Sequence, residues 1–438
     1  MSTVRTAGAA CSAAPGAATV FGERGCKGFA PRQAVADEPR GPAIDNPAAT
    51  GPCSGAMSPP TRRTTDALAA DLFAPLLRPQ PPGAAWRVVS HDAEQGLCLT
   101  LACGDRVLLV EFEPRDDAAD CYARTRRFNV CVRPRFAGAD LTEHERGLVS
   151  GVVATVRQRE LRLPVADPAP AADGRAAVRE VSAGRVLIPE GRGQYYLNPY
   201  AGCMIGCPFC YVAPRADLSR ALDGQARRAW GRWVDVKVDA PEVLRREVRS
   251  LPPGPVRMSP ILTDPYQPVE RTYRLTRRCL EVLLDAGFSP VVLTRGARVV
   301  EDVELLARFP RAAVGLSIPT DDDAVRRRFE PGADPIEARL DALAQCRAAG
   351  LRTFVAVQPM LPMDPARLVA LSAPHAHVAR VDRMYALDRV RHLYDAAGCP
   401  EAMTDGFFAR TGAALSEGYA ARGVHVDALD DMDALLGP

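Results

Sequence analysis

Three cysteines in one short segment are the residues of this chain whose type and spacing could do chemistry. Cys203, Cys207 and Cys210 follow the pattern C-x3-C-x2-C. A segment of this length can bring three thiolates to one side of a small metal cluster, and thiolates bind iron–sulfur clusters and zinc. A structural zinc site is closed by four ligands. A cubane cluster on three thiolates keeps one iron open to an outside ligand, so the pattern favours an iron–sulfur cluster that takes part in a reaction.

Two simpler explanations stay open at this point. The three cysteines could form a structural zinc loop, or they could be unrelated core residues, because cysteine is among the most buried residue types. The chain has 13 cysteines, and outside this segment they are scattered rather than paired at disulfide-like spacings. Unpaired cysteines are typical of a reducing cytoplasm, which an oxygen-sensitive cluster would also require. We therefore predict a cytoplasmic protein in which these three cysteines alone bind a cluster.

The residues around the cysteines narrow the interpretation. The three-cysteine spacing, with an aromatic residue before the third cysteine, resembles the signature of the radical S-adenosylmethionine (SAM) superfamily. Two further segments resemble motifs of one branch of this superfamily, the spore-photoproduct-lyase-like branch. They are Asn198-Pro199-Tyr200-x-Gly202-Cys203 and Thr263-Asp264-Pro265-Tyr266-Gln267-Pro268. The resemblance covers about residues 182–362. It implies an enzyme with a [4Fe–4S] cluster that reductively cleaves SAM to a 5′-deoxyadenosyl radical, which takes a hydrogen atom from the substrate.

Strand-like segments alternate with helical patterns through the same region. We expect strands at 195–199, 234–238, 256–261, 290–294, 314–318 and 354–358, and helices at 241–251, 273–286, 300–309 and 336–349. Such alternation with short turns predicts a parallel sheet, and right-handed crossovers can curl it into a barrel. The predicted fold class is therefore α/β, a partial (β/α)6 barrel, which is also what the resemblance implies. Its active face should be formed by the carboxyl ends of the strands.

The resemblance implies SAM-binding roles for residues at the ends of the second and third expected strands. Thr263 and Asp264 would receive the ammonium group of the SAM methionine, and Lys237 would lie near its carboxylate. The alternative for Thr263 and Asp264 is an ordinary proline-rich turn that they cap, and for Lys237 it is a solvated strand end. Arg295 stands where the family usually has lysine, and this leaves its role open because arginine and lysine differ in geometry.

Later strand ends supply the remaining candidates. The resemblance implies that Ser317 faces the ribose and methionine, that Arg339 clamps the SAM carboxylate, and that Val357 and Met360 contact adenine. Each has an alternative without a ligand. Ser317 could bond to its local backbone, Arg339 could pair with Glu330, and core packing alone would account for Val357 and Met360.

The rest of the chain divides by composition. Residues 1–63 are rich in Ala, Gly, Pro and Ser, which predicts a disordered tail. Residues 64–163 read as a small α+β domain of unknown role, and the proline-rich segment 164–181 reads as a linker, so we expect this domain to fold independently of the cluster site. The barrel is expected at 182–375 and a C-terminal extension at 376–438.

Charge and hydropathy limit the partners. The net charge of +2 does not support nucleic-acid binding, and no apolar run is long enough to span a membrane. The resemblance implies an external electron donor of the flavodoxin or ferredoxin type and a substrate that is not identified, with a peptide or other macromolecule as one candidate. Two alternative functions stay open: a nucleic-acid lesion lyase of the spore photoproduct lyase type, and a non-catalytic iron–sulfur or zinc module.

Overall fold

The computed structural model describes most of the chain after the expected tail. The described ranges are 64–77, 86–92, 97–104, 106–114, 121–134, 141–160, 163, 176–259, 263–385, 387–427 and 432–437. The expected disordered tail and residues 164–175 of the expected linker lie outside them.

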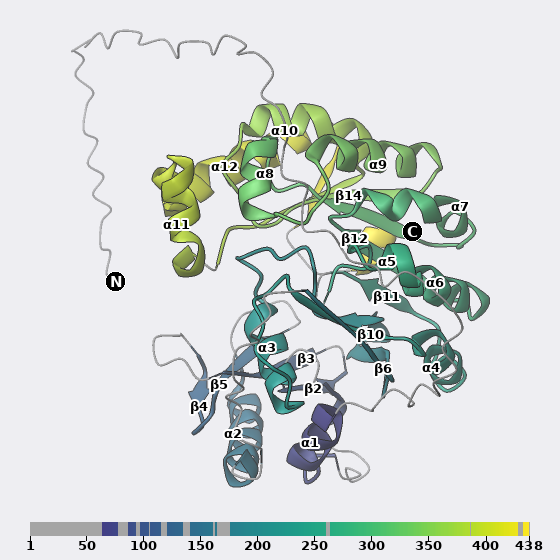
Figure 1. Ribbon diagram of the computed structural model, residues 1–438, viewed down its shortest axis with the longest axis vertical. Coiled ribbons are helices and arrows are strands. Elements are labelled where there is room, and N and C mark those ends of the chain that lie inside the picture. The colour runs from purple at the N-terminus through teal and green to yellow at the C-terminus, as the bar shows by residue number, and fades with distance from the viewer. Residues whose placement is uncertain are drawn as a thin grey trace, which may run out of the picture. The chain divides into compact units, whose positions relative to one another are not determined.

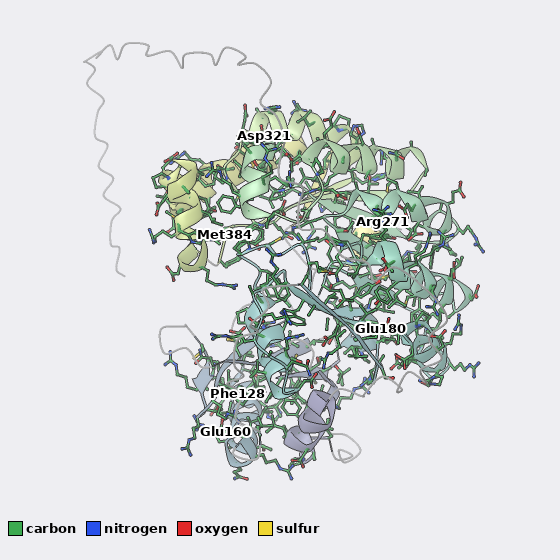
Figure 2. The ribbon with its side chains drawn as sticks, in the orientation of Figure 1. Phe128, Glu160, Glu180, Arg271, Asp321 and Met384 are labelled. Atoms are coloured by element: carbon green, nitrogen blue, oxygen red, sulfur yellow. The ribbon has the colours of Figure 1, made fainter. Side chains whose placement is uncertain are left out.

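An antiparallel sheet packed against helices forms the first described part (Figure 1). Its strands, in the spatial order β1-β2-β3-β5-β4, are β1 (Arg87–Asp92), β2 (Leu97–Cys103), β3 (Arg106–Pro114), β5 (Phe128–Pro134) and β4 (Ala123–Arg124). Helices α1 (Thr64–Phe73) and α2 (Glu143–Arg159) contribute to its hydrophobic core. Glu160, at the end of α2, is buried and accepts hydrogen bonds from Thr125 Oγ1 at 2.7 Å and from Arg126 N at 2.9 Å (Figure 2). We call this part the N-terminal domain.

The second part is built on an open eight-stranded sheet. Its spatial order is β16-β15-β14-β13-β12-β11-β8-β7. The strands are β7 (Leu187–Gly191), β8 (Gln194–Leu197), β11 (Pro255–Met258), β12 (Ser289–Thr294), β13 (Ala313–Ser317), β14 (Arg352–Val357), β15 (Val378–Val381) and β16 (His425–Asp427). All neighbours pair in parallel except β7, which runs antiparallel to β8. Among the described residues β7 and β16 do not pair, so the barrel is partial, as predicted.

Apolar side chains cover both faces of this sheet, as parallel sheets require. One face packs against the surrounding helices and includes Val292, Val314 and Val355. The opposite face includes Val291, Ala313, Phe354 and Val378, and it is covered by the short helix α13 (Met432–Leu436). The face away from the surrounding helices is the concave side of the barrel. Because side chains alternate along a strand, every second residue of each strand faces this side.

The helices follow the strands in the expected alternation. They are α3 (Ala213–Leu222), α4 (Ala240–Glu247), α5 (Glu270–Tyr273), α6 (Leu275–Asp285), α7 (Val303–Leu306), α8 (Asp323–Phe329), α9 (Ile336–Ala348), α10 (Pro365–Ser372), α11 (Leu387–Ala397) and α12 (Asp405–Ala420). The four predicted helices are present, the third as a 3-10 turn over Ala297–Asp302 followed by α7. Within the described ranges, every helix is too short or too polar to cross a lipid bilayer.

Three features of the sheets differ from the sequence expectation. The strand expected at 234–238 exists as β10 (Trp233–Lys237), but it belongs to a separate three-stranded sheet between β6 (Ala177–Val181) and β9 (Tyr200–Ala201). Strand β6 lies within the expected linker. Strands β15 and β16 come from the expected C-terminal extension and continue the barrel sheet. Periodicity predicts that a strand exists, but its partner depends on long-range pairing that the local pattern does not contain.

Candidate metal-cluster site

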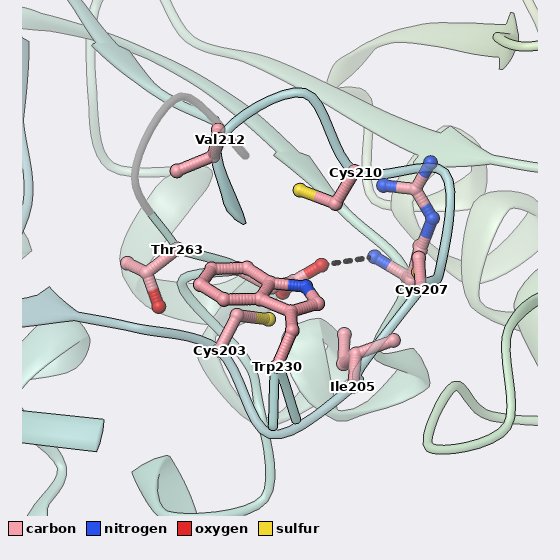
Figure 3. Close-up of a pocket in the computed structure, with 9 residues that line it drawn as sticks. Cys203, Ile205, Cys207, Cys210, Val212, Trp230 and Thr263 are labelled. Carbon is pink, nitrogen blue, oxygen red and sulfur yellow. Dashed lines mark hydrogen bonds between the residues drawn. The ribbon is translucent and has the colours of Figure 1, made fainter. Parts of the chain in front are cut away.

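The three cysteines lie in the loop between β9 and α3 and line one pocket (Figure 3). Its other lining residues come from the loop itself and from three further places in the chain: Ile205, Val212, Trp230, Thr263, Asp264 and Arg295. Cys203, Cys207 and Cys210 thus lie around one pocket, and that they bind a cluster there stays a prediction.

Side chains after β11 hold the start of the cysteine loop. Thr263 Oγ1 donates to the carbonyl of Gly202 at 2.7 Å, and Gln267 Nε2 donates to the same carbonyl at 3.2 Å. Gln267 Oε1 in turn accepts from Met204 N at 2.9 Å. One amide side chain thus bonds to the backbone on both sides of Cys203, which fixes the direction in which this thiol points.

The middle and end of the loop are held by close backbone contacts. Gly332 N donates to Ile205 O at 3.0 Å. Gly206 and Gly231 both have positive φ angles, and a Cβ on Gly231 would lie 2.7 Å from the Cα of Gly206, so the two backbones touch. From α11, Arg389 Nη1 donates to Cys210 O at 2.9 Å. The loop is therefore fixed by segments far apart in the sequence.

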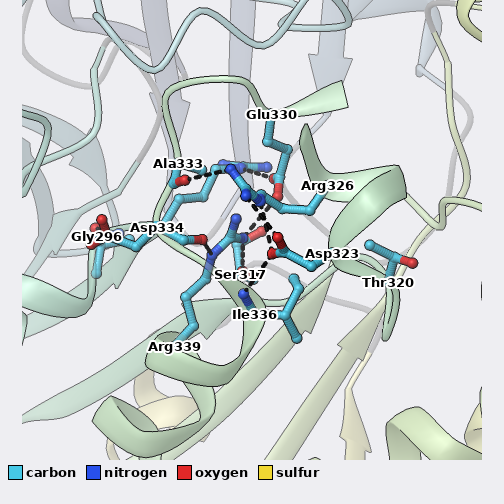
Figure 4. Close-up of polar contacts among 12 residues, drawn as sticks. Gly296, Ser317, Thr320, Asp323, Arg326, Glu330, Ala333, Asp334, Ile336 and Arg339 are labelled. Carbon is cyan, nitrogen blue, oxygen red and sulfur yellow. Dashed lines mark hydrogen bonds and ion pairs between the residues drawn. The ribbon is translucent and has the colours of Figure 1, made fainter. Parts of the chain in front are cut away.

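A buried charge network lies beside the pocket (Figure 4). Glu330 is fully buried between two guanidinium groups: Arg295 Nε donates to its Oε1, and Arg339 Nη1 lies 2.8 Å from its Oε2. Burial raises the pKa of the Glu330 carboxyl, but the charges of Arg339 and Arg295 lower it by a larger amount. The pKa of Glu330 is therefore below its usual value. Because Arg295 also lines the cysteine pocket, this network brings a positive charge to the place where thiolates would form.

Of the residues predicted to contact SAM, Thr263 and Asp264 lie at the cysteine pocket, and Lys237 bonds to the backbone that leads into the cysteine loop. Thr263 and Asp264 line the cysteine pocket. Asp264 accepts hydrogen bonds from Arg295 N at 2.7 Å and Tyr266 N at 2.9 Å, and burial raises its pKa despite these bonds. Lys237 is only 1% exposed, and its Nζ donates to Asn198 O at 2.8 Å. The alternative of a solvated lysine is therefore wrong, because this side chain binds the backbone that leads into the cysteine loop.

The remaining predicted contacts lie beyond the pocket wall. Ser317 is buried, and its Oγ has no hydrogen-bond partner among the described residues. Ser317 and Ala313 are four residues apart on β13, so both side chains lie on the same face of the strand, the concave side of the sheet. Arg339 donates to the Ser317 carbonyl at 2.7 Å in addition to pairing with Glu330. Val357 and Met360 are buried in the main hydrophobic cluster and do not line the cysteine pocket.

A buried carboxyl group stabilises the strand that enters the cysteine loop. Tyr200 Oη donates to Glu270 Oε2, which also accepts from Thr276 N at 3.1 Å, and Arg277 N donates to Oε1 at 3.3 Å. Burial outweighs these hydrogen bonds and raises the pKa of Glu270 to about 7. Sequence reasoning gave Glu270 no role, although it closes the Thr-Asp-Pro-Tyr-Gln-Pro segment.

Glu270→Gln is expected to remove a pH-dependent loss of stability. Since burial holds the pKa of Glu270 at about 7 in the folded state, the folded protein binds a proton there that the unfolded chain releases above about pH 4.5. Stability from this group is thus present at low pH and lost as pH rises towards 7, by up to about 3 kcal/mol. Urea unfolding at several pH values should show a weaker decline in the variant. An identical slope in both proteins would contradict the assignment.

The donor set fits a cluster better than a single ion. Within the described ranges, no three Cys, His, Asp or Glu side chains are placed to bind one metal ion together. A zinc ion needs sulfur ligands about 2.3 Å from one point, whereas a cubane binds each thiolate through a different iron. Burial raises the pKa of Cys203 to about 12 and raises the pKa values of Cys207 and Cys210, so cluster binding must displace their protons.

The region that holds this site is similar to known sequences. The family model described as the radical SAM superfamily matches residues 197–367. An uncharacterised protein of Methanocaldococcus jannaschii is 29% identical over 169 residues, which is 39% of this chain and 61% of that protein. A protein of Acidianus two-tailed virus is 31% identical over 175 residues, 39% of this chain and 57% of the viral protein. The protein of Pseudomonas phage M6 named radical SAM Nalpha-GlyT isomerase is 28% identical over 166 residues, 38% of this chain and 33% of that protein. The chain thus spans at most 61% of the length of these relatives.

Two solved structures give weaker likenesses. A spore photoproduct lyase mutant with bound AdoMet and dinucleoside spore photoproduct aligns with a TM-score of 0.42 at 14% identity, covering 58% of this chain and 82% of that one. SuiB of Streptococcus suis bound to S-adenosylmethionine aligns with a TM-score of 0.31 at 12% identity, covering 59% of this chain and 53% of SuiB.

Proposed function

We propose, on the premise of the radical SAM superfamily match over residues 197–367, that Cys203, Cys207 and Cys210 bind one [4Fe–4S] cluster and that the protein is an enzyme that cleaves SAM reductively. The observation that carries the proposal is the shared pocket: three thiols, a carboxyl group and a guanidinium group line one cavity. When bound, the cluster supplies an open iron and the electron that cleaves SAM to a 5′-deoxyadenosyl radical. The protein supplies position and shielding from water.

Different residues of the chain position the cysteine loop, the thiols and SAM. Thr263 and Gln267 hold the backbone beside Cys203. Arg295 brings a cation to the thiols, which favours their ionised form. The hydroxyl group of Ser317 has no partner among the described residues and faces the concave side, so it is available to a SAM hydroxyl or carboxylate group.

The other predicted SAM contacts follow from the same geometry. We propose that Asp264 receives the SAM ammonium group at the pocket wall. Lys237 and Arg339 act on the SAM carboxylate indirectly: each donates a hydrogen bond to a backbone carbonyl, that of Asn198 or Ser317, and so holds the backbone of the site in place. Val357 and Met360 form the apolar layer behind the adenine site.

Donor, substrate and compartment belong to the same proposal. The electron comes from an external donor of the flavodoxin or ferredoxin type, and the substrate is a peptide or other macromolecule. The ten described cysteines form no disulfide with one another, which fits a reducing cytoplasm. A nucleic-acid lesion lyase is the less favoured candidate, because the net charge of +2 gives no electrostatic footprint for nucleic acid.

Reductive SAM cleavage is the direct test. Protein purified and reconstituted without oxygen, then given SAM and dithionite, is expected to release 5′-deoxyadenosine and methionine even without substrate. The Cys210→Ala variant is the control and should release neither. If the wild-type protein holds its cluster and binds SAM yet forms no 5′-deoxyadenosine, the proposed reaction is wrong.

A further inference from the structure

Helix α3 belongs to the cluster site at one end and to the N-terminal domain at the other. It begins directly after Cys210, and its N-cap residue Val212 lines the cysteine pocket. At its other end, Leu222 is part of the hydrophobic core of the N-terminal domain, with Leu218 packed against that core. The helix therefore spans the distance between the third cysteine and a separate hydrophobic core (Figure 1).

A buried ion pair joins α3 to strand β3. Arg215 Nη1 lies 2.6 Å from Glu111 Oε1, and its Nη2 and Nε lie 2.7 Å and 3.1 Å from Glu113 Oε1. The Arg215 side chain is only 3% exposed. Glu111 and Glu113 are two residues apart, so they project from the same face of β3. The strand thus presents two carboxylates to the fork of one guanidinium group, a geometry that lysine cannot reproduce.

The backbone between this ion pair and the third cysteine is a continuous run of turns. Cys210 N donates to Cys207 O at 3.0 Å, Ala213 N to Cys210 O at 3.3 Å, and Arg215 N to Val212 O at 3.1 Å. The guanidinium group also lies 5.5 Å from the ring centre of Tyr211, the residue after Cys210. A shift of Arg215 would therefore be transmitted to Cys210 through the four residues between them, which have little freedom of their own.

We propose that Arg215 is a positioning residue for Cys210, through which the N-terminal domain fixes the third thiol of the cluster site. The proposal rests on the proposed function, since it concerns the same cluster. It also revises the sequence expectation that the N-terminal domain folds independently of the cluster site. That expectation came from the proline-rich segment, which says nothing about a helix shared between the two parts.

The test compares three full-length variants with the wild type. Arg215→Met removes the ion pair, Arg215→Lys keeps one charge without the fork, and Arg106→Met is the matched control. Arg106 forms a bidentate pair with Glu145 wholly inside the N-terminal domain, at 2.7 and 2.9 Å. Each protein is prepared without metal and treated with iodoacetamide, and alkylation of Cys203 and Cys210 is followed separately by mass spectrometry. Reconstituted samples then give iron content and the electron paramagnetic resonance spectrum of the reduced cluster.

We expect Arg215→Met to speed alkylation of Cys210 by about tenfold, because the end of the loop opens more often, while Cys203 keeps its wild-type rate. Its cluster should be lost faster to a chelator and show an altered resonance spectrum. Arg215→Lys should recover part of each effect, and Arg106→Met should change none of them. If Arg215→Met is insoluble, Glu113→Gln weakens the same pair and takes its place.

Wild-type alkylation and cluster retention in the Arg215 variants would overturn the proposal, as would an equal effect from Arg106→Met. The alkylation measurement needs no cluster. If the wild-type protein bound no iron, the proposed function would fail, while selective exposure of Cys210 would still decide the role of Arg215.

Discussion

Replacing Cys203, Cys207 and Cys210 together by alanine is expected to abolish the brown colour of the reconstituted protein and its iron and sulfide content, from about four of each per chain. The three thiols line one pocket, and the other seven described cysteines do not line it. Without them the iron has no sulfur ligands at this place. Iron and sulfide analysis after anaerobic reconstitution gives the result.

A matched control separates ligand loss from general damage. Cys279 is also fully buried, but it lies in the hydrophobic core and does not line the pocket. Cys279→Ala should therefore keep the full cluster. Iron retained in the triple variant, or lost equally in the control, would show that another site holds the metal.

The second large effect is expected from Glu330→Gln. This change leaves the guanidinium groups of Arg295 and Arg339 buried without their carboxylate. Breaking a buried pair by removing one partner typically costs about 3–5 kcal/mol, because the remaining charge stays uncompensated. We expect a loss of stability of that order in urea unfolding, together with weaker cluster retention, since Arg295 lines the pocket.

Glu242→Gln is the comparison for this variant. Glu242 also pairs with an arginine, Arg278 at 3.0 Å, but the side chains of Arg278 and Glu242 are 41% and 46% exposed. Exposed pairs contribute about 0–1 kcal/mol, so its loss should be much smaller. The pKa of Glu330 lies below the usual value in the folded protein, so its contribution is present at neutral pH and is lost as pH falls through that lowered pKa. Equal effects from the two variants would show that the buried network gives no special stability.

Local pattern was enough to predict the barrel elements and to single out the three cysteines that line one pocket. The strands ending at Thr294 and Ser317 and the helix before Gly350 carry clear periodicity, and three cysteines in eight residues need no distant partner to be recognised. Pairing between distant segments was not accessible in this way. Strand β10 shows the limit, because its alternation is ordinary while its neighbours, β6 and β9, come from segments that gave no strand signal of their own.

The same limit applies to the site. Arg295 and Glu330 are 35 residues apart, and Arg215 and Glu111 are 104 residues apart. Charged residues in such positions usually lie on the surface, so nothing in the sequence distinguishes these pairs from solvated ones. For Lys237 the sequence predicted its place at a strand end but not its burial. Its burial against the Asn198 carbonyl depends on how the cysteine loop packs.

The open barrel leaves two edge strands, which could pair with strands of other molecules. Different features limit such pairing at each edge. Strand β16 is only three residues long, too short to template much pairing. Strand β7 contains Pro189, which has no N–H to offer, and its register shifts between Pro189 and Gly191. The N-terminal domain adds to this protection, since Ser90 Oγ donates to Pro189 O at 2.8 Å. Removing that domain would expose an unpaired strand edge, so the isolated barrel should be the form of this protein most prone to aggregate.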